Sequence, residues 1–488
     1  MVASECEPFA KTGGLADVVD ALARALGRRG HRVDVVLPFY RGLRPPTGPF
    51  QRRTITVPVG GPPGARRDAG DRATIDLVDA DADGYRLRLV DHPFSFDRSD
   101  YYVEEGRDFA DNAARFALLG AAAMEGIRLD GEPVDLLHGH DWQAGPLILA
   151  VRAARSAPRA ASSAMLGDPA TVLTCHNLAY HGWTAREFAW QLGAPGEGVG
   201  DADGVDLLRE AIRGADLVNT VSPTYARESQ RPEYGAGTDD LLRARGDRYL
   251  GILNGIDTVL WDPAVDPALA APFATADLAG KAACRADLVK RHGLDPDGPI
   301  LGLVGRLDPQ KGFDLLTEAA DRLVALGARL IVLGTGDHAL VAGLQALATR
   351  APTRVAVIDR FDRDEARRIY AGADAFLMPS RFEPSGQGQL IALRYGTVPI
   401  VRATGGLADT IVDADAHPAS GNGFSFVPAE ADALLAACRR AMAAYADPTR
   451  WATLITRGMA EDHSWDRPAA AYEAMYERAL TLRAAERG

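Results

Sequence analysis

Cysteine is scarce in this sequence. Its 488 residues include four cysteines, which stand far apart at Cys6, Cys175, Cys284 and Cys438. No two of them have the spacing of a disulfide framework or of a zinc-binding pair. Scarce, unpaired cysteine is typical of proteins that fold in a reducing compartment. The sequence therefore predicts free thiols and a cytoplasmic location.

Long apolar runs are missing as well. None reaches the roughly 20 residues that a membrane-spanning helix needs, and the first residues lack the basic and apolar segments of a signal peptide. Met1–Ser4 instead has the character of the end of a buried strand, because a glycine turn follows almost at once. Two interpretations are open: the strand is short, or the start codon is placed a few residues late.

Positive charge is in the minority. The sequence has 54 Lys and Arg against 66 Asp and Glu, a net charge of −12. This balance argues against nucleic acid or an anionic membrane as the main partner. A local basic pocket on an acidic protein can still hold a phosphorylated ligand, and a neutral polymer is indifferent to the net charge. The composition specifies no oligomeric state.

The order of apolar runs predicts the fold class. Strand-like runs alternate with amphipathic helical stretches, and the runs are continuously apolar, which is typical of parallel strands covered on both faces. This pattern predicts an α/β protein of doubly wound, Rossmann-like domains. The expected strands are Val33–Leu37, Val134–Leu137, Thr171–Thr174, Leu217–Val221, Ile300–Val304, Leu330–Leu333, Val355–Ile358, Ala375–Met378 and Val398–Val401. The expected helices include Asp17–Arg28, Phe313–Leu323, Leu390–Tyr395 and Arg467–Arg487, and surface insertions are expected at Arg44–Gly64 and Ala157–Pro169.

The length predicts more than one domain, because a domain usually spans about 100–200 residues. We place the boundary near Leu250–Asn254. The expected units are residues 1–250, residues 251–466 and a last helix, 467–488, that packs back across both domains. The two Rossmann-like domains are expected to face each other across a cleft.

One hexapeptide occurs twice. Thr12–Asp17 (TGGLAD) recurs letter for letter at Thr404–Asp409, and each copy precedes a helical stretch. A glycine turn at a helix start exposes backbone N–H groups that bind anions. Alternatively, the glycines merely permit a tight turn. One copy in each half favours the functional interpretation.

Two strand ends in the second half carry polar residues suited to a nucleotide-sugar. The strand at Ile300 runs into a turn with Arg306 and Lys311, and a guanidinium and an ammonium there suit a diphosphate leaving group. The strand at Ala375 runs into Glu383 and a glycine-rich helix start, which suit sugar hydroxyls and phosphate. Taken alone, each segment is also compatible with ordinary surface charges or a capping glutamate.

A third site is expected in the first half. His138, His140, Asp141 and Trp142 end one strand, and a segment from His176 to His181 follows another. Aromatic faces and polar edges bind carbohydrate. A metal site is the rival interpretation, but these spacings match no standard zinc pattern. No serine hydrolase triad, phosphate-binding P-loop or paired-carboxylate hydrolase pattern is present.

At these residues the sequence closely resembles the bacterial glycogen synthase family, which is related to plant starch synthases. The shared motifs run almost end to end: Lys11–Asp17, His140–Trp142, His176–Tyr180, Ser222–Arg227, Leu253–Asp257, Arg306 with Lys311 and Gly312, Arg381–Pro384 and Thr404–Gly406. The resemblance implies the GT-B fold, ADP-glucose as donor, an α-1,4-glucan such as glycogen as acceptor, retention of configuration and no metal or other cofactor. The first domain is then the acceptor side, and the second binds the nucleotide-sugar.

The resemblance also implies roles for single residues. Catalytic positions are His176 near the reacting sugar, Arg306 and Lys311 on the departing ADP, and Glu383 on the glucose ring. Donor-binding positions are Lys11, Gly14, Asn254, Ser385, Gly386, Thr404, Gly405 and Gly406.

The sequence departs from the family pattern at one place. Cys-Gly-Leu usually follows Glu-Pro, whereas Ser385, Gly386 and Gln387 stand here. If backbone amides hold the donor, the change is tolerable; if the missing side chains pack against glucose, rate or donor choice shifts. Two alternatives therefore stay open: another retaining GT-B glucosyltransferase that makes a small saccharide, and a catalytically weak glucan-binding homologue.

Overall fold

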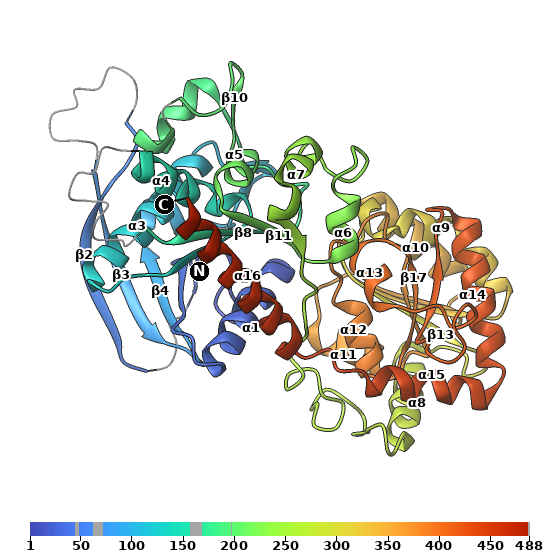
Figure 1. Ribbon diagram of the computed structural model, residues 1–488. Helices are drawn as coiled ribbons and strands as arrows, with labels where there is room; N and C mark the ends of the chain where they lie inside the picture. Colours follow the sequence, from blue (N-terminus) through green and yellow to red (C-terminus); the bar gives the residue numbers. More distant parts are fainter. Residues whose placement is uncertain (44–47, 62–71, 157–167, 197, 487–488) are drawn as a thin grey trace. The chain divides into compact units, whose positions relative to one another are not determined.

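A computed structural model of the chain describes residues 1–43, 48–61, 72–156, 168–196 and 198–486 (Figure 1). The chain folds into two compact units. Unit 1 comprises Met1–Val221, Ala226–Ile252 and Trp465–Gly488, and unit 2 comprises Ser222–Tyr225 and Leu253–Ser464. The main crossing, from Ile252 to Leu253, lies inside the expected boundary segment.

Two four-stranded sheets form the centre of unit 1, in the orders β12-β11-β8-β7 and β1-β4-β3-β2. Val2 forms a parallel bridge to Gly139 of β7 and another to Val36 of β1, so it joins the two sheets. The strands of unit 1 are β1 (Asp34–Pro38), β2 (Phe50–Pro58), β3 (Arg72–Asp81), β4 (Arg86–Asp91), β5 (Val103–Glu104), β6 (Arg107–Asp108), β7 (Leu136–His140), β8 (Ala170–Cys175), β9 (Trp183–Ala185), β10 (Gly204–Asp206), β11 (Leu217–Thr220) and β12 (Tyr249–Gly251).

Helices cover the parallel strands of unit 1. Helices α3 and α4 contact each other and the strands β1 and β7 respectively, while α1 contacts β1 and α16. The helices of unit 1 are α1 (Gly14–Arg28), α2 (Pro93–Phe96), α3 (Asn112–Asp130), α4 (Gly145–Ser156), α5 (Leu207–Gly214), α7 (Asp239–Arg245) and α16 (Asp466–Ala485), with α6 (Pro223–Glu228) shared between the units and short 3₁₀ turns η1 (Trp142–Ala144), η2 (Arg186–Leu192), η3 (Ala194–Gly196) and η4 (Gly246–Arg248).

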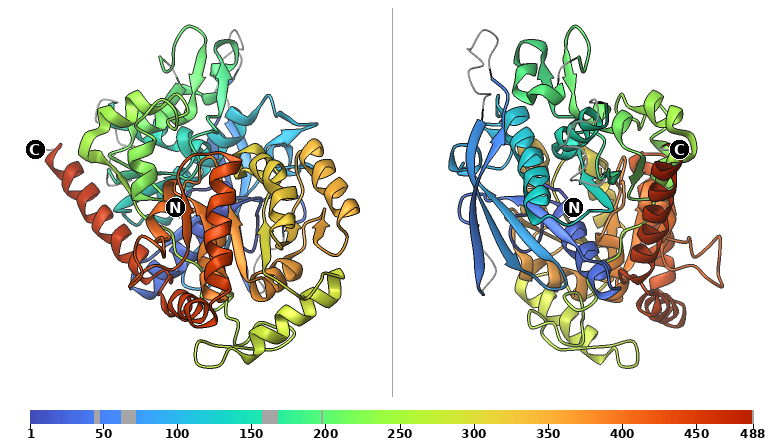
Figure 2. Two further views of the ribbon diagram at one scale, coloured as in Figure 1. Left: turned by 90° about the vertical axis from the view of Figure 1, so that its right-hand side faces the viewer. Right: turned by 60° about the vertical axis from the view of Figure 1, so that its left-hand side comes forward.

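Two expectations for unit 1 are wrong. The surface insertion expected at Arg44–Gly64 contains β2, which pairs antiparallel with β3 at the edge of the sheet (Figure 2). Ile55 and Val57 are buried and their neighbours exposed, so this strand alternates and lacks the continuous apolarity used to find the others. The strand expected at Val134–Leu137 is shifted, because β7 extends to His140. The insertion expected at Ala157–Pro169 lies almost entirely outside the described residues.

Unit 2 is a six-stranded parallel sheet in the order β15-β14-β13-β16-β17-β18. Numbered within the unit, this order is 3-2-1-4-5-6, that of dinucleotide-binding Rossmann domains. The strands are β13 (Ile300–Val304), β14 (Arg329–Leu333), β15 (Val355–Ile358), β16 (Ala375–Met378), β17 (Val398–Arg402) and β18 (Phe424–Phe426). The five strands expected here from continuous apolarity are all present.

Helices cover both faces of the unit 2 sheet. Leu301 and Leu303 of β13 face a core that includes α9 and α14, whereas Ile300 faces a core that includes Leu288 of α8 and Ile369 of α11. Alternate residues of one strand thus enter different cores, which is why the strand is apolar throughout. The helices are α8 (Ala279–His292), α9 (Phe313–Ala325), α10 (His338–Arg350), α11 (Arg363–Gly372), α12 (Gly388–Arg394), α13 (Gly405–Thr410), α14 (Ala431–Tyr445) and α15 (Pro448–Ala460), with the 3₁₀ turn η5 (Pro309–Lys311).

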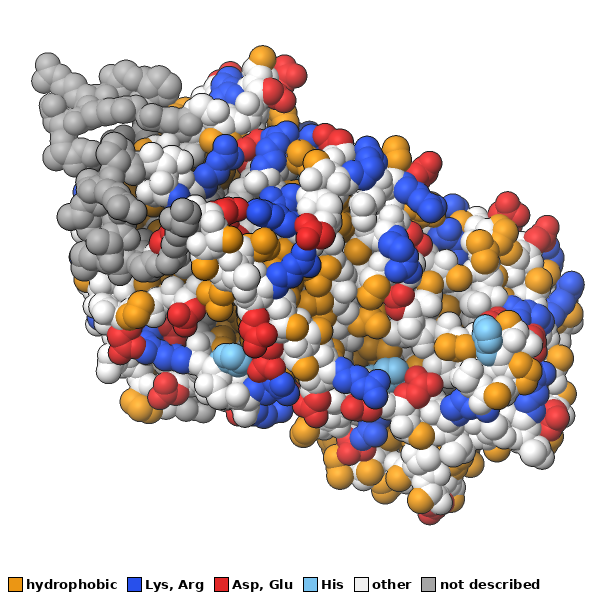
Figure 3. Space-filling view, in the orientation of Figure 1, with side chains coloured by type: hydrophobic (Ala, Val, Ile, Leu, Met, Phe, Trp, Pro, Cys, Tyr) orange, Lys and Arg blue, Asp and Glu red, His pale blue; other side chains and the backbone are white. Residues whose placement is uncertain are grey.

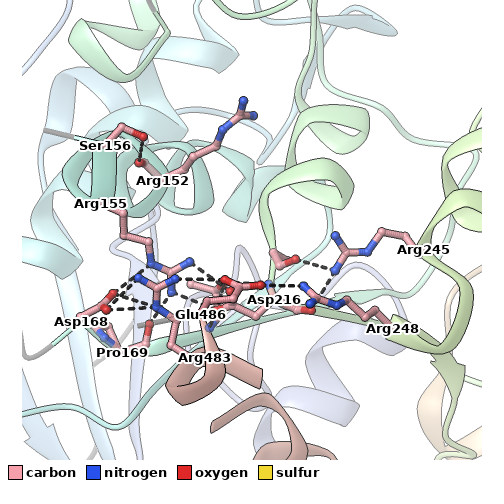
Figure 4. A network of polar contacts seen from close by, with 12 residues as sticks. Arg152, Arg155, Ser156, Asp168, Pro169, Asp216, Arg245, Arg248, Arg483 and Glu486 are labelled. Atoms are coloured by element: carbon pink, nitrogen blue, oxygen red, sulfur yellow. Dashed lines mark hydrogen bonds and ion pairs between the residues drawn. The ribbon is translucent and has the colours of Figure 1, made fainter. Parts of the chain in front are cut away.

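The last helix, α16, belongs to unit 1 by its packing. It lies on α1 and β8. Near its end, Arg483 donates hydrogen bonds from Nε and Nη2 to Asp168, and Arg155 of α4 joins Asp168 to Asp216 (Figure 4). The helix was expected to pack across both domains, whereas these interactions hold it on unit 1.

The surface carries charged side chains of both signs, and the helices lack long apolar stretches, as the composition predicts. On the face seen in Figure 3, basic and acidic side chains of the described residues are interspersed over both units. Within the described part of the chain, no helix combines the length and apolar character required to cross a membrane.

Candidate functional site

The candidate donor site lies at the carboxyl ends of β13 and β16 in unit 2. These strands are neighbours in the sheet, and the chain leaves them toward opposite edges, so the strand order reverses at this point. Lys311 follows β13 and Glu383 follows β16. The Nζ atom of Lys311 lies 2.9 Å from Oε1 and 2.7 Å from Oε2 of Glu383. Lys311 and Glu383, which were placed from the sequence at two strand ends with separate roles, are therefore in direct contact.

The two loops approach each other through a glycine. Gly312 has φ +72°, and a Cβ atom there would lie 2.0 Å from the carbonyl oxygen of Pro379. The N–H of Arg381 donates to the carbonyl of Gln310 at 2.8 Å. Only glycine fits between these backbones, so the sequence Lys311-Gly312 places the ammonium against the carboxylate.

Glu383 is 5% exposed and holds a nearly complete set of partners. Besides Lys311, the hydroxyl of Ser380 donates to its Oε2 atom at 2.9 Å. A carboxylate has about four acceptor positions, and three are used here. One position on Oε1 therefore remains for a hydroxyl group of a ligand.

Arg306 stands at the same end of β13. It follows the strand by two residues, its side chain is largely exposed, and its Nη2 atom lies 3.6 Å from Asp308. Asp308 also caps η5, because its Oδ1 atom accepts from the N–H of Lys311 at 2.9 Å. Asp308 thus contacts the side chain of Arg306 and the backbone of Lys311, the two residues assigned to a diphosphate from the sequence.

The second TGGLAD copy packs directly on the Glu383 loop. The N–H of Gly406 donates to the carbonyl of Glu383 at 3.1 Å. Cβ atoms on Gly405 and Gly406 would lie 2.0 Å from the carbonyls of Glu383 and Ser385 respectively. Thr404 precedes α13, so the start of this short helix packs on the backbone of the Glu383 loop. The structure thus brings the loops after β13, β16 and β17 together.

The backbone carbonyls of Ser385 and Gly386 hold the Glu383 loop on α12. The side-chain amide nitrogen (Nε2) of Gln389 donates to the carbonyls of both residues at 3.1 Å. Gly386 has φ +71°, and a Cβ atom there would lie 2.5 Å from Oε1 of Gln389. The side chain of Ser385 is buried and makes only a long contact, 3.5 Å, to the carbonyl of Gly386.

Asn254 lies in the segment where the chain enters unit 2. Its side chain is buried, and its Oδ1 atom has no hydrogen-bond partner among the described residues. The next residues pack against the end of unit 2: the N–H of Ile256 donates to the carbonyl of His463 at 2.8 Å. The contacts of this segment do not link Asn254 to the Lys311 and Glu383 loops.

The first TGGLAD copy forms the start of α1 in unit 1. Glu5, which sequence reasoning missed, accepts hydrogen bonds from Thr12 Oγ1 at 2.6 Å and Gly13 N at 3.2 Å. No atom lies within 4 Å of a Cβ position on Gly13 or Gly14, so the helix start is open. Lys11 is held by Asp17, 2.5 Å from its Nζ atom. The only signal for Glu5 in the sequence is its place directly after an apolar run, which does not indicate the segment it binds.

His138, His140 and His176 of unit 1 form one connected group. His140 Nδ1 lies 3.0 Å from His176 Nε2, and the ring centroids of His138 and His140 are 4.1 Å apart. His138 in turn contacts Thr174 at 2.6 Å and the hydroxyl of Tyr476 at 2.8 Å. His138 and His140 were expected to end a strand: His140 is the last residue of β7, His138 lies inside it, and both are buried.

Burial sets the protonation of this group. It lowers the pKa of His176 to about 3 and holds the pKa of His140 well below its usual range, so both rings are neutral near pH 7. Burial also raises the pKa of Asp141 to about 7, although backbone N–H groups of His176 and Asn177 favour its charged form. The N–H of His176 donates to Asp141 Oδ1 at 2.6 Å.

The two copies of the hexapeptide use their last residue differently. Asp17 pairs with Lys11, whereas Asp409 accepts hydrogen bonds from Ser222 Oγ at 2.6 Å and Thr224 N at 2.9 Å. Asp409 thus holds the Ser222–Tyr225 segment on unit 2. The repeat itself was the only sequence signal for this contact.

The described side chains do not form the kind of cluster that binds a metal ion. Among the described residues, no group of three or more His, Cys, Asp or Glu side chains is arranged to hold a metal ion. In the donor site the charged group beside Glu383 is the ammonium of Lys311.

Comparison with known proteins relates both units to glycosyltransferases. Residues 1–244 match the starch synthase catalytic domain family, and residues 285–453 match glycosyl transferases group 1. The glycogen synthase of Syntrophotalea carbinolica is 40% identical over 99% of both chains. That of Anaeromyxobacter dehalogenans is 44% identical over 97% of this chain and 98% of its own.

Solved structures agree with the fold. The catalytic domain of starch synthase IV from Arabidopsis thaliana, bound to ADP and acarbose, has a TM-score of 0.85 and 32% identity over 98% of both chains. Sucrose-phosphate synthase from Thermosynechococcus elongatus shares the fold, with a TM-score of 0.60 at 19% identity. From its donor loops, its Rossmann topology and these relatives, the chain belongs to the glycogen synthase family and is a glycosyltransferase of the GT-B fold.

Proposed function

We propose that this enzyme transfers glucose from ADP-glucose to the non-reducing end of an α-1,4-glucan, with retention of configuration. Unit 2 binds the nucleotide-sugar and unit 1 binds the glucan. The observation that carries the proposal is the Lys311–Glu383 pair at the point where the strand order of unit 2 reverses. Bound ADP in the starch synthase IV structure supports the nucleotide, and the glycogen synthase relatives support the acceptor.

Positive charge near the leaving diphosphate makes the main contribution to catalysis. As the glycosidic bond to the diphosphate breaks, negative charge builds up on the phosphate oxygens, and Arg306 and Lys311 neutralise it. Fixed charges aimed at developing charge lower the barrier most, because they need no reorganisation during the reaction. Lys311 is already held by Glu383, which prepares its position before the donor binds.

Glu383 and the glycine loops orient the donor. The remaining acceptor position of Glu383 takes a hydroxyl group of glucose. The loops that carry Ser385, Gly386, Thr404, Gly405 and Gly406 border the phosphates, and the start of α13 favours an anion there. Lys11 and Gly14 also serve the phosphates. Asn254, whose buried amide oxygen has no partner among the described residues, accepts a hydrogen bond from the donor.

The acceptor attacks from the face that the diphosphate leaves. The new bond joins the acceptor hydroxyl oxygen to the anomeric carbon, while the bond to the phosphate oxygen breaks. The departing phosphate receives the proton of that hydroxyl group, so retention requires no enzyme nucleophile. His176 stays close to the reacting sugar as a neutral imidazole, because its pKa is about 3.

ADP release tests the proposal directly. ADP-glucose and UDP-glucose are each supplied with and without glycogen, and with and without a chelator such as EDTA. We expect nucleotide release mainly from ADP-glucose, dependent on glycogen and insensitive to the chelator, with lengthened glucan chains as product. Formation of a small saccharide would identify a different transferase, and glycogen binding without ADP release would identify a binding protein.

A further inference from the structure

Glu5 follows the short parallel bridge at the start of unit 1. Val2 pairs in parallel with Gly139 of β7 and with Val36 of β1, and Glu5 comes three residues later. Loops at the carboxyl ends of parallel strands are where α/β sheets bind their ligands. Glu5 is nevertheless only 3% exposed. A buried carboxylate needs hydrogen-bond donors, so the identity of its donors indicates what it does.

Four hydrogen bonds saturate the Glu5 carboxylate. Its Oε2 atom accepts from the backbone N–H groups of Thr12 at 2.5 Å and Gly13 at 3.2 Å. Its Oε1 atom accepts from the hydroxyl groups of Thr12 and Tyr102, each at 2.6 Å. A carboxylate has about four acceptor positions, so none remains for a ligand. Glu5 therefore holds other parts of the chain and does not itself bind substrate.

Tyr102 connects this carboxylate to α3. The hydroxyl oxygen of Tyr102 lies 2.8 Å from Oγ of Ser4, besides its contact with Glu5. Its carbonyl accepts from Nδ2 of Asn112 at 3.0 Å, and its ring centroid lies 6.3 Å from that of Phe116. Asn112 and Phe116 both belong to α3. The glycine turn that begins α1 is thus fixed to α3 through Glu5 and Tyr102.

The two TGGLAD copies are held by different kinds of acceptor. In the second copy, the N–H of Thr404 donates to the carbonyl of Arg402 at 2.9 Å, and the N–H of Gly406 donates to the carbonyl of Glu383 at 3.1 Å. These acceptors are neutral, whereas a carboxylate holds the first copy. Hydrogen bonds to a carboxylate are roughly twice as strong as those between neutral groups. Glu5 therefore fixes its turn firmly, and it occupies two N–H groups that could otherwise bind a phosphate.

The far end of the first turn stays accessible. Gly14 is exposed, and no atom from another segment of the described chain lies within 4 Å of a Cβ position on it. The first N–H groups of a helix have no acceptor within that helix. The side chain of Lys11 is 30% exposed, and its Nζ atom lies 2.5 Å from Asp17. Gly14 and Lys11 are therefore the groups of this turn that are left to reach a phosphate.

We propose that Glu5 is a positioning residue, which orients the Thr12–Gly13 turn so that Gly14 and Lys11 reach the diphosphate of the donor. The inference rests on the proposed function for the identity of the donor, while the four hydrogen bonds assign the role of Glu5. Glutamine at position 5 keeps the shape of the side chain, but its amide nitrogen cannot accept a hydrogen bond. Two of the four hydrogen bonds are then lost, and the turn is no longer held in one orientation.

Equilibrium binding of ADP tests this role without requiring catalysis. Calorimetry compares the Kd for ADP of wild type, Glu5→Gln and Tyr102→Phe, and steady-state kinetics give kcat and the KM for each substrate. The matched control is Glu104→Gln, which makes the same chemical change at an exposed position two residues from Tyr102. Melting temperatures establish that each variant is folded.

We expect Glu5→Gln to raise the Kd for ADP and the KM for ADP-glucose about tenfold, because a displaced turn loses hydrogen bonds to a charged phosphate. The KM for glycogen stays unchanged. Tyr102→Phe leaves the two N–H contacts of Glu5 in place and gives a smaller rise, and Glu104→Gln behaves as wild type.

An unchanged Kd for ADP in Glu5→Gln would overturn the inference, as would a lower melting temperature with unchanged KM values or a raised KM for glycogen alone. If Glu5→Gln does not fold, Tyr102→Phe decides, and an ADP affinity equal to that of wild type then overturns the inference. A wild-type enzyme that binds ADP but transfers no glucose contradicts the proposed function alone, because the ADP affinities still decide the role of Glu5.

Discussion

At the scale of single residues, the Lys311–Glu383 contact joins the residue proposed to bind the donor's phosphate to the residue proposed to bind its glucose. The lysine is proposed to serve the phosphate and the glutamate the sugar, and their contacts at 2.7 and 2.9 Å fix one relative to the other. A displaced ammonium would therefore misplace the carboxylate as well. Loss of either partner is expected to affect turnover more than donor affinity.

Replacing the cations tests this assignment. We expect Arg306→Ala and Lys311→Ala each to lower kcat by about 10²–10³, with a smaller change in the KM for ADP-glucose, because their charge acts mainly in the transition state. Steady-state kinetics of ADP release measure both constants. Arg350→Ala, at an exposed ion pair of α10, is the matched control and keeps wild-type kinetics. Near-normal turnover of either test variant would contradict the role.

The pKa of His176 leads to a prediction about pH. Because burial lowers this pKa to about 3, the ring is neutral at every pH above about 4. The ratio of wild-type to His176→Gln kcat is therefore expected to be constant from pH 5 to pH 8. A ring with the ordinary pKa of about 6.5 would lose its contribution below that pH, and the ratio would fall. His417→Gln, at an exposed position of unit 2, is the control.

The departure from the family pattern at Ser385 is expected to matter little. The residue contributes its carbonyl to Gln389, and its hydroxyl makes only a long contact. Ser385→Cys nearly conserves volume, so we expect kcat/KM to change less than about tenfold. Gly386→Ala is the contrasting variant: its φ of +71° and the 2.5 Å approach to Gln389 predict a much larger loss. Similar kinetics for the two variants would argue against a backbone role.

At the scale of elements, a buried lysine joins α8 to the ends of its neighbours. Lys281 Nζ donates to the carbonyls of Ala371, Ala373 and Tyr395 at 2.9–3.3 Å and contacts Thr397 Oγ1 at 2.9 Å. Burial lowers its pKa to about 8, so the ammonium form persists at pH 7. This one side chain satisfies carbonyl groups where α11 and α12 end.

We therefore expect Lys281→Met to destabilise unit 2. Each buried carbonyl left without a donor costs about 1–3 kcal/mol. Thermal and urea unfolding at pH 7 measure the loss. Lys290→Met, at an exposed position of the same helix, is the control and should leave stability within about 0.5 kcal/mol. Equal stability of the two variants would show that the four contacts contribute nothing.

The sequence predicted elements well where a strand is buried on both faces. In unit 2 the strands expected at Ile300–Val304, Val355–Ile358 and Ala375–Met378 have the same bounds in the structure. It failed where a strand has one exposed face, as in β2, and where polar side chains continue a buried strand, as at His138. There the stabilising contacts come from residues distant in sequence, Thr174 and Tyr476, which periodicity does not reveal.

At the scale of the whole molecule, the candidate site was predictable because it follows from topology. Parallel strands end at one edge of their sheet, so Arg306, Lys311 and Glu383 had to lie near one another once their strands were neighbours. Glu5 and Asp409 were not predictable. Both act by holding backbone and side-chain donors of other segments, and an isolated acid in a sequence does not indicate which segment it binds.

The last helix gives a prediction about the whole chain, because α16 returns from the end of unit 2 to unit 1. Arg483 and Arg478 both make ion pairs there, but Arg483 binds half-buried Asp168 with two nitrogens, whereas Arg478 binds Asp247 at the surface. A hydrogen bond to a charged group contributes about 1.5–3 kcal/mol to stability. An ion pair exposed to solvent contributes about 0–1 kcal/mol. We expect Arg483→Ala to lower the melting temperature by several degrees and to increase proteolytic cleavage before α16, while Arg478→Ala does neither. Equal cleavage in the two variants would mean that packing on α1 and β8, and not the Asp168 network, holds the helix.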